Sequence, residues 1–528
     1  MTSLDLLLER AAARRGNAPA IRTETGTLSW AALHDRVRHV AGGLAGLGVG
    51  FGHRVAFWLP NGLPWLVLHL ACARLGAVTV AINPRFRAVE LADIVSRSNA
   101  KTLVLAPQGD DVDHLAVLAE ADPAALDGLR HLIQVGEPGR SPLPGAATVT
   151  YAALETAAPW HLAPSPEDAP IVMFATSGTT ARPKLVLHAQ KLAVAHGFDV
   201  ARVTGYPDPG SVVFHALPFC GAFGYTQLLG CLATGADMVV PTGFDPVVAA
   251  RLVESNRVTH MAGSDDLLHR LLQGADALGL GERPFPHLRS VAYAAFNAAL
   301  PDFAAAAAAR GLPLRAGFGM SESFALFAFR KADEPPERRP VGGGTPVNMN
   351  GAARIVDPAT GEAMPVGEPG ALQIRSPNLM LGYDGDEAAT EAAFTADRWL
   401  KTGDLGRLDG DGGFSFLGRA DDFLRLSGFL VNPLEIEARI LELPGIAAAQ
   451  VVEAAARKGS RPVAFVVLEP GAALDEAAVI AHCKSGLAAF KAPVRVVALD
   501  GFPAAAGANG VKTRRGELRA LARKALGR

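Results

Sequence analysis

The chain has 528 residues, of which 49% are hydrophobic and 19% are charged, and its formal net charge is −2. This length exceeds the usual size of one domain, so two or more domains with ample apolar core are expected. No basic field in the sequence suggests binding to nucleic acid, and no acidic tail suggests a disordered segment for a partner.

The cysteines and the start of the chain bear on location. Only four cysteines occur, none in the spacing of a zinc or redox pair: Cys72, Cys220, Cys231 and Cys483. This usage favours a reducing compartment without disulfides. Residues 1–5 carry an early acid and lack a signal pattern. The most apolar run, 65–82, is interrupted by His69 and Arg74 and is too short to span a membrane. We therefore expect a cytoplasmic protein without stable membrane insertion.

The first third of the chain is typical of an α/β fold. The region before residue 54 is predicted to be helical, with Leu and Ala at helical spacing over 30–47. Strand and helix patterns then alternate in this order: strand 54–59, helix 65–75, strand 77–82, helix 88–98, strand 102–105, helix 116–121 and strand 131–135. Such alternation predicts a parallel sheet covered by helices.

A polar loop follows, between two predicted buried strands that end at 174 and begin at 185. It carries hydroxyl side chains around a glycine, then a lysine set by Pro183: Thr176, Ser177, Gly178, Thr179, Thr180 and Lys184. Such a turn can wrap phosphate oxygens, and the lysine adds a positive charge. On these residues alone an ordinary solvated turn is the alternative. The lysine does not follow a glycine as in a Walker loop.

The rest of the chain divides into three stretches. A second α/β stretch reaches about residue 319: strand 212–217, helix 226–234, strand 237–240 and an alanine-rich surface helix over 304–309. From 342, Gly/Pro turns between short strands such as 371–375 indicate a small, mostly β subdomain. After 418, a hairpin-like stretch precedes helix 433–441, strand 463–468, helix 476–487 and strand 494–497, which indicates an α+β domain of about a hundred residues.

Two further stretches carry groups suited to a nucleotide. In 317–322, the Phe318 ring can stack on adenine, the Ser321 hydroxyl can hold a phosphate oxygen, and the Glu322 carboxylate can hold Mg²⁺. In 399–406, Asp404 follows a tight turn and can accept both hydroxyls of a ribose. A buried Phe, a surface Glu and a common turn are the alternatives for these residues taken alone.

Two more stretches complete a set of five. Residues 418–437 run from Gly418 through paired aspartates to a proline that opens a helix, and 502–519 form a Gly-rich loop with Lys512. In this order, the five stretches resemble the motifs of the adenylate-forming superfamily, which includes acyl-CoA synthetases, aryl-acid–CoA ligases, luciferases and peptide-synthetase adenylation domains. The resemblance extends over nearly the whole chain.

The resemblance implies a fold and a set of sites. It implies an α/β and α+β multidomain protein: an N-terminal adenylation domain over 1–418, with two helix-covered mixed sheets and a small β subdomain, and a mobile C-terminal domain over 419–528. The catalytic residues would be Lys512, Lys184 and Glu322, with Glu322 holding Mg²⁺. The implied ATP or AMP site comprises Thr176, Ser177, Gly178, Thr179, Thr180, Lys184, Ala294, Ala295, Phe318, Gly319, Met320, Ser321, Asp404, Arg419 and Lys512.

The resemblance also implies an acid pocket, a hinge and a path for a thiol. Asp421 would be the pivot between the domains, and Gly428 would let the arm of coenzyme A pass. The implied pocket residues are Phe219, Gly221, Phe223, Ala294, Phe318, Ala325 and Leu326. This set has no charge to hold an amino group, which favours an aryl or aliphatic acid over an amino acid.

The chain departs from the family pattern at several positions. Ala181 and Leu185 stand where glycines are common. Val511 separates Gly510 from Lys512, whereas the family pattern places glycine directly before the lysine. Gly221 replaces a histidine or aromatic residue, which suggests a gate that is open or differently built. Phe296 interrupts a small-residue segment and would narrow the acid pocket.

We therefore expect an enzyme that joins a hydrophobic carboxylic acid to coenzyme A with ATP and Mg²⁺, through an acyl-adenylate. Its partners would be small molecules and not nucleic acid, and a homodimer is left open. One alternative is a stand-alone adenylation enzyme that loads a carrier-protein thiol. Another is a nucleotide-binding relative that has lost catalysis.

Overall fold

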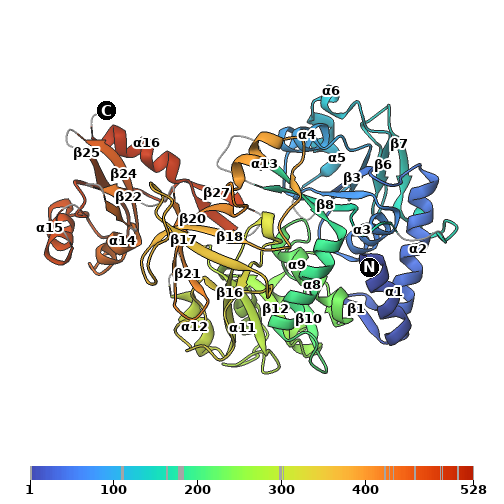
Figure 1. Cartoon of the computed structure of the whole chain (residues 1–528), viewed down its shortest axis with the longest axis horizontal. Coiled ribbons are helices and arrows are strands. Elements are labelled where there is room, and N and C mark those ends of the chain that lie inside the picture. Colours follow the sequence, from blue (N-terminus) through green and yellow to red (C-terminus); the bar gives the residue numbers. More distant parts are fainter. Residues whose placement is uncertain are drawn as a thin grey trace. The chain divides into compact units, whose positions relative to one another are not determined.

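The computed structural model describes residues 3–108, 112–161, 165–176, 183–296, 300, 302–420, 424–426, 429–431, 433–456, 459–487, 489, 491–507 and 510–526. The chain forms two compact units. The large unit comprises Met1–Ala295, Asp302–Ala352 and Ile374–Leu400, and the small unit comprises Phe296–Pro301, Ala353–Gln373 and Lys401–Arg528 (Figure 1).

One sheet of the large unit has the strand order β19-β9-β8-β4-β3-β5-β6-β7. Its strands are β3 (Arg54–Trp58), β4 (Val78–Ala81), β5 (Thr102–Leu105), β6 (His131–Gln134), β7 (Ala147–Thr150), β8 (Pro170–Thr176), β9 (Lys184–Ala189) and β19 (Gly382–Tyr383). The strands from β8 to β7 in this order run parallel, whereas β9 and β19 pair antiparallel at one edge. The predicted parallel sheet is therefore confirmed, with a mixed edge beside the polar loop.

A second sheet contributes the order β16-β15-β14-β13-β12-β10-β11-β1-β2 to the large unit. Its strands are β1 (Pro19–Thr23), β2 (Gly26–Ser29), β10 (Val212–Phe214), β11 (Asp237–Val239), β12 (His260–Ser264), β13 (Ser290–Ala294), β14 (Leu314–Phe318), β15 (Ala328–Phe329) and β16 (Gly343–Pro346). The run from β14 to β1 is parallel. Parallel strands have their carboxyl ends at one edge of the sheet, which is where α/β proteins bind ligands.

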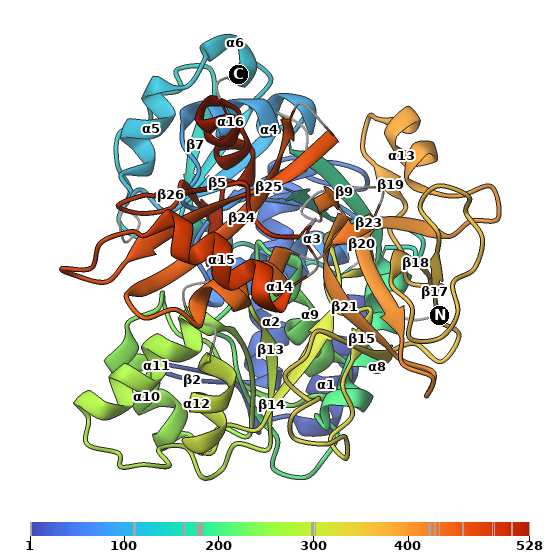
Figure 2. The same ribbon diagram turned by 90° about the vertical axis from the view of Figure 1, so that its left-hand side faces the viewer.

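Helices cover both sheets. They are α1 (Leu4–Arg15), α2 (Trp30–Gly46), α3 (Leu63–Leu75), α4 (Ala88–Arg97), α5 (His114–Glu120), α6 (Pro123–Leu126), α7 (Tyr151–Glu155), α8 (Gln190–Thr204), α9 (Ala222–Thr234), α10 (Pro246–Ser255), α11 (Asp265–Ala277), α12 (Phe303–Ala309) and α13 (Glu387–Ala393). Helices α4, α5 and α6 share an apolar cluster with one face of the first sheet. Helices α11 and α12 lie beside strands β12 to β14 (Figures 1 and 2).

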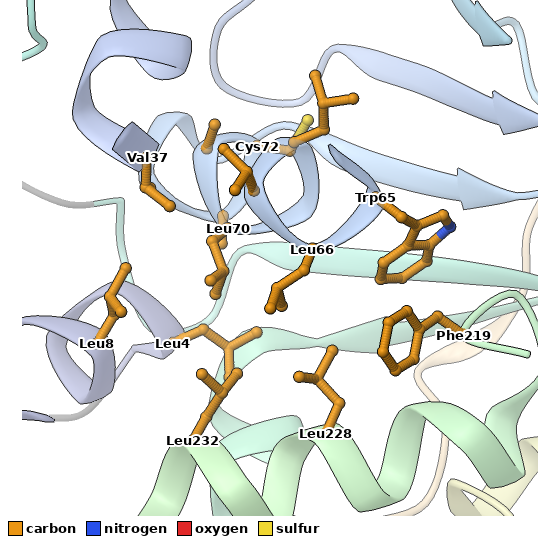
Figure 3. Close-up of a cluster of buried hydrophobic side chains, with 14 of the residues drawn as sticks. Leu4, Leu8, Val37, Trp65, Leu66, Leu70, Cys72, Phe219, Leu228 and Leu232 are labelled. Carbon is orange, nitrogen blue, oxygen red and sulfur yellow. The ribbon is translucent and has the colours of Figure 1, made fainter. Parts of the chain in front are cut away.

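The main core lies between the two sheets, around α3 and α9. Helix α3 is buried on all sides from Trp65 to Leu75, as expected for a helix enclosed within a core. Trp65 and Phe219 face each other with ring centroids 5.3 Å apart, and leucines from α1, α3 and α9 fill the space beside them (Figure 3). This packing fixes the sheets against one another, and therefore fixes the loops at their edges.

The small unit contains a β part and an α+β part. The β part has the order β17-β18-β20-β21, with β17 (Ala352–Val356), β18 (Gly370–Arg375), β20 (Leu400–Leu408) and β21 (Phe414–Arg419). The α+β part contains β22 (Leu424–Leu426), β23 (Phe429–Val431), α14 (Pro433–Leu441), β24 (Ile446–Ala456), β25 (Gly459–Leu468), α15 (Glu476–Gly486), β26 (Arg495–Ala498), β27 (Ala504–Gly507), β28 (Gly510–Thr513) and α16 (Arg515–Ala525).

Side chains alternate across the sheet of the α+β part. On β25, Ala464 and Val466 face the cluster that contains α14 and α15, whereas Val463 and Phe465 face the cluster that contains α16. This two-residue period is the signature of a strand covered on both faces. The predicted combination of a large two-sheet domain and a small α+β domain is confirmed.

One element prediction was wrong. The region before residue 54 is not helical throughout, because β1 and β2 form an antiparallel pair there. Strand β1 also pairs in parallel with β11, more than two hundred residues later. That partner is distant in sequence, so local helical spacing could not reveal it. Elsewhere the predicted elements are confirmed with small boundary shifts; α5, for example, begins at His114 because Asp113 caps it.

Among the described residues, the helices lack the combined length and apolar character that a bilayer crossing requires.

Candidate active site

The predicted nucleotide and acid residues of the large unit gather at the carboxyl ends of parallel strands. Ala294 is the last residue of β13 and Phe318 the last of β14, and these strands are adjacent and parallel. Phe219 and Gly221 follow β10 in the same sheet. Segments far apart in sequence therefore lie along one sheet edge.

The polar loop is held by a strand hairpin. Strands β8 and β9 pair antiparallel up to Thr176 and Lys184, so the two ends of the loop are adjacent. Arg97, the last residue of α4, donates to the Pro183 carbonyl over 2.8 Å and pairs with Asp93 at 2.6 Å. Ser177, Gly178, Thr179 and Thr180 lie outside the described residues, so the assignment of phosphate binding to them stays a prediction.

The segment after β14 is a tight turn. A Cβ added to Gly319 would lie 1.9 Å from the Ala325 carbonyl oxygen, so this position accepts only glycine without a backbone shift. Phe324 and Ala325 have φ of 53° and 64°, a conformation that is uncommon for residues other than glycine. Such outliers concentrate at functional sites. Between Gly319 and Phe324 lies the short helix η1 (Ser321–Ser323), which carries Glu322.

Tyr383 connects two of the predicted catalytic residues. Its hydroxyl donates to Glu322 Oε1 over 2.7 Å, and Lys184 Nζ lies 4.4 Å from the centre of its ring. Glu322 and Tyr383 are each 7% exposed. Burial, and then the nearby Glu322 carboxylate, raise the pKa of Tyr383, so its hydroxyl is protonated and able to donate.

His188 contacts the turn that follows β14 at two points. Its Nε2 lies 2.8 Å from the Ser321 carbonyl oxygen, and its ring stacks on Phe324 with centroids 3.7 Å apart. Burial lowers the pKa of His188 to about 4, so it is neutral near pH 7. A neutral imidazole whose Nε2 carries the proton can donate to that carbonyl, which fixes the turn beside Glu322.

Four of the seven predicted acid-pocket residues share one apolar cluster. Phe223 and Leu326 belong to a single buried cluster, against which Ala294 and Ala325 pack. Phe219 instead is fully buried in the main core against Trp65. Gly221 precedes α9 at its N-terminal end. Phe318 is buried at the end of β14.

The small unit brings two other predicted residues together. Asp404 on β20 and Arg419 on β21 are direct partners in the strand register, and Arg419 Nε lies 3.2 Å from Asp404 Oδ1. Asp404 is 5% exposed. The tight turn predicted before Asp404 is not found, because residues 402–404 lie within strand β20. Gly403 has φ of 73°, which favours glycine at this position. The Thr402 hydroxyl accepts from the Asp404 backbone N–H over 3.0 Å and fixes the backbone there.

Three residues assigned from the C-terminal stretch are Lys512, Asp421 and Gly428. The backbone of Lys512 lies on β28, in register with Ala505 of β27, while its side chain lies outside what the structure describes. Asp421 and Gly428 lie outside the described residues as well, so the hinge, the coenzyme path and the domain boundary at 418 stay predictions. Ala295 and Met320 lie next to Ala294 and Gly319, beside β13 and β14.

Sequence reasoning missed Tyr383, His188 and Arg97. Each acts on a segment distant in sequence, and no local pattern marked it. Gly382-Tyr383 precedes a capped helix, since Asp386 accepts from Ala389 N at the start of α13. That cap could have located the turn, but it could not have identified the partner of the tyrosine.

The described residues contain no group of three or more His, Cys, Asp or Glu side chains that could hold a metal ion. Glu322 offers a single buried carboxylate, which carries the hard oxygen ligands that Mg²⁺ prefers. Mg²⁺ commonly takes one or two carboxylates together with water and substrate phosphates. The donor set therefore fits an ion that binds together with a nucleotide.

Two helix-covered sheets and a small α+β domain form the architecture that the resemblance to adenylate-forming enzymes implies. Residues 8–384 match the family described as AMP-binding enzyme, and residues 435–508 match the AMP-binding enzyme C-terminal domain. The chain belongs to the AMP-binding enzyme family, within the adenylate-forming, acyl-CoA ligase superfamily.

Relatives and solved structures cover almost the whole chain. A Mycobacterium tuberculosis protein named 3-[(3aS,4S,7aS)-7a-methyl-1,5-dioxo-octahydro-1H-inden-4-yl]propanoyl:CoA ligase is 32% identical over 481 residues, covering 89% of this chain and 90% of that one. The 4-coumarate--CoA ligase 5 of Oryza sativa subsp. japonica is 30% identical over 525 residues, covering 95% and 91%. The structure of ATP-bound MatB from Rhodopseudomonas palustris superposes with a TM-score of 0.82 at 26% identity, covering 99% and 100%.

Proposed function

We propose that this enzyme activates a hydrophobic carboxylic acid with ATP to an acyl-adenylate, and then transfers the acyl group to coenzyme A. The observation that carries the proposal is the arrangement around Tyr383. Lys184, at the end of the polar loop, and Glu322 meet at one side chain. A cation and a metal-binding carboxylate next to a hydroxyl-rich loop suit the phosphates of ATP.

The acid class follows from the pocket. Phe223 and Leu326 lie in a buried hydrophobic cluster, and none of the seven residues assigned to the pocket is charged, which favours an uncharged substrate body over an amino acid. Two relatives are named as CoA ligases, one for an alicyclic propanoate and one for 4-coumarate. Aryl, alicyclic and aliphatic acids that end in a free carboxylate are therefore the candidates.

In the first half-reaction, a carboxylate oxygen of the acid attacks the α-phosphorus of ATP, and pyrophosphate leaves with the electron pair of the broken bond. Two anions must approach each other, so positive charge is needed at the phosphates. Lys184 and Lys512 supply it from the chain. Glu322 would hold Mg²⁺, which neutralises phosphate charge when bound. Asp404, fixed against Arg419, would accept hydrogen bonds from the ribose hydroxyls.

In the second half-reaction, the thiolate of coenzyme A attacks the acyl carbonyl carbon, and AMP leaves with the oxygen that joined it to the acyl group. The thiol must reach the acyl carbonyl at the position that Lys512 occupies in the first half-reaction of this proposal. The proposed answer is rotation of the C-terminal domain about Asp421, with Gly428 lining the path of the thiol. The use of coenzyme A and the reduced cysteines together support a cytoplasmic site of action as part of this proposal.

The test is a pyrophosphate-release screen across benzoates, phenylpropenoates, alicyclic propanoates and fatty acids, with and without coenzyme A, followed by mass analysis of the products. We expect acid-dependent pyrophosphate release and an acyl-CoA product for at least one hydrophobic acid. Glu322→Gln should reduce the first half-reaction by roughly a hundredfold.

Other outcomes would change the assignment. An acyl-adenylate that forms but passes only to a carrier-protein thiol would identify a stand-alone adenylation enzyme. ATP binding without pyrophosphate release for any acid would identify a non-catalytic nucleotide-binding relative. Release that depends only on amino acids would contradict the proposed pocket.

A further inference from the structure

We propose that Tyr383 is a positioning residue that sets Glu322 for the metal ion and Lys184 for the phosphates of ATP at the same time. The inference rests on the proposed function and extends it to a residue with no assigned role. Its basis is that one side chain contacts both groups: the hydroxyl contacts the carboxylate and the ring contacts the ammonium.

Tyr383 is itself firmly held. It lies on β19, which pairs antiparallel with β9, with Tyr383 opposite Val186. Its backbone N–H donates to the Thr390 hydroxyl over 2.8 Å. The next residue, Asp384, pairs with Arg54 at 2.7 Å. A side chain supported on both sides in this way can transmit its position to the groups that it contacts.

The hydroxyl group of Tyr383, called here the hydroxyl arm, acts on Glu322, and its aromatic ring, called the ring arm, acts on Lys184. The carboxylate is buried, and a hydrogen bond to Oε1 restricts its rotation and leaves the other oxygen, Oε2, to turn toward a cation. The backbone of Glu322 is fixed separately, because its carbonyl accepts from Met380 N over 2.8 Å. Hydrogen bonds to metal-binding carboxylates orient them, and their loss typically weakens metal affinity by ten- to a hundredfold.

The ring arm acts on Lys184. The ammonium lies 4.4 Å from the ring centre, within the distance at which the ring face attracts a cation. Lys184 is the first residue of β9 and follows the polar loop directly. The ring therefore limits where the ammonium can lie before a phosphate arrives, which reduces the entropy that binding must remove.

The alternative is that Tyr383 only fills space. Phenylalanine would fill almost the same space and would keep the ring for Lys184, so Tyr383→Phe isolates the hydroxyl arm. Tyr383→Leu removes both arms. If Tyr383→Leu does not accumulate as folded protein, Tyr383→Met replaces it. The matched control is Tyr225→Phe, because the Tyr225 hydroxyl is also buried and also contacts a single side chain, His69, at 2.9 Å.

Each arm has its own binding measurement, made without the acid so that no turnover occurs. Mn²⁺ affinity in the presence of ATP, measured by electron paramagnetic resonance, reports the hydroxyl arm. The affinity of a fluorescent ATP analogue in EDTA reports the ring arm. Glu322→Gln serves as the reference for loss of the metal ligand.

We expect Tyr383→Phe to weaken Mn²⁺ binding roughly tenfold, while metal-free nucleotide binding changes less than about twofold. Tyr383→Leu should show the same loss for Mn²⁺ and, in addition, weaken metal-free binding roughly threefold to tenfold. Tyr225→Phe should leave both affinities near those of the unaltered enzyme.

Three results would overturn the inference. If Glu322→Gln weakens Mn²⁺ binding but Tyr383→Phe does not, the tyrosine does not position the carboxylate, and the proposed function survives. If Tyr225→Phe weakens Mn²⁺ binding as much as Tyr383→Phe, the effect is that of any lost buried hydroxyl. If Glu322→Gln leaves Mn²⁺ binding intact, both this inference and the metal site of the proposed function fail.

Discussion

Several histidines of the large unit are buried in the core without charge. Burial lowers the pKa of His69, His196 and His215 to about 3 in each case. His196 on α8 is typical, with its Nε2 2.6 Å from the Thr226 hydroxyl. These side chains pack as polar core residues, and their protonation on unfolding affects the stability of the fold.

The His196 shift predicts acid sensitivity. Its folded pKa lies below the unfolded value of about 6.5, so the unfolded chain binds more protons between these two values. The free energy of unfolding must therefore fall as the pH drops below about 6.5, by up to about 1.4 kcal/mol per pH unit for one such group. In His196→Gln, the midpoint of guanidinium-induced unfolding should therefore change less with pH between pH 7 and 5 than in the unaltered protein.

The control for this prediction is His161→Gln, which changes an exposed histidine. Its midpoint should follow that of the unaltered protein across the same range. If the midpoint of His196→Gln changes with pH as much as that of the unaltered protein, His196 does not take up a proton on unfolding as described.

Replacement of Arg97, which lies outside the polar loop, is expected to weaken nucleotide binding. Its guanidinium holds the Pro183 carbonyl at 2.8 Å, just before Lys184. A hydrogen bond from a charged group is worth about 1.5–3 kcal/mol, so Arg97→Ala should raise the KM for ATP roughly tenfold and change kcat less. Steady-state kinetics with saturating acid and coenzyme A measures both.

Arg310 provides a matched control. It also pairs with an aspartate, Asp276, at 2.7 Å, and also donates to a backbone carbonyl, that of Glu282, at 2.8 Å. It lies after α12, away from the polar loop in the sequence. If Arg310→Ala raises the KM for ATP as much as Arg97→Ala, the anchoring role is wrong.

At the scale of elements, the turn after β14 is the least tolerant segment of the candidate site. Gly319→Ala would place a Cβ against the Ala325 carbonyl, and backbone atoms cannot rotate away as a side chain can. We expect a loss of about 1–3 kcal/mol in stability and a marked loss of ATP affinity, because Phe318 and Glu322 flank this position. Thermal unfolding and nucleotide titration would measure the two effects.

Gly46→Ala is the corresponding control. Gly46 ends α2 and has open space around its Cβ position. Alanine favours helix more than glycine does, so this variant should be as stable as the unaltered protein or slightly more stable. Equal tolerance at both glycines would contradict the tight turn at 319.

Element prediction worked where local patterns decide structure. Helix α14 begins at Pro433 as its N-terminal proline predicts, and strand β5 has the predicted bounds of 102–105. It failed for β1, which pairs in parallel with the distant strand β11, and for β2, which pairs with β1. Tertiary pairing overrides weak local preference in such strands.

At the scale of the whole molecule, the proposed mechanism has one site perform two half-reactions: the first uses Lys512, and the second needs space for the thiol. Lys512→Ala should therefore reduce adenylate formation by roughly a hundredfold to a thousandfold, yet largely spare thioester formation from supplied acyl-adenylate. Separate half-reaction assays test this, with Lys524→Ala on the exposed face of α16 as the control. Equal losses in both half-reactions would refute the assignment of Lys512.

The order of the motifs and the combination of a large α/β domain with a small α+β domain could be predicted from the sequence, because each depends on residues close together in the chain. The apolar character of the residues assigned to the acid pocket is likewise a property of the sequence, while the pocket itself stays a prediction. The partners of Glu322 and Lys184 could not. Tyr383 reaches Glu322 only because β19 pairs with β9 while η1 follows β14, and that proximity is set by sheet pairing and core packing between distant segments. Side-chain contacts across such distances depend on the assembled fold, which local propensity does not specify.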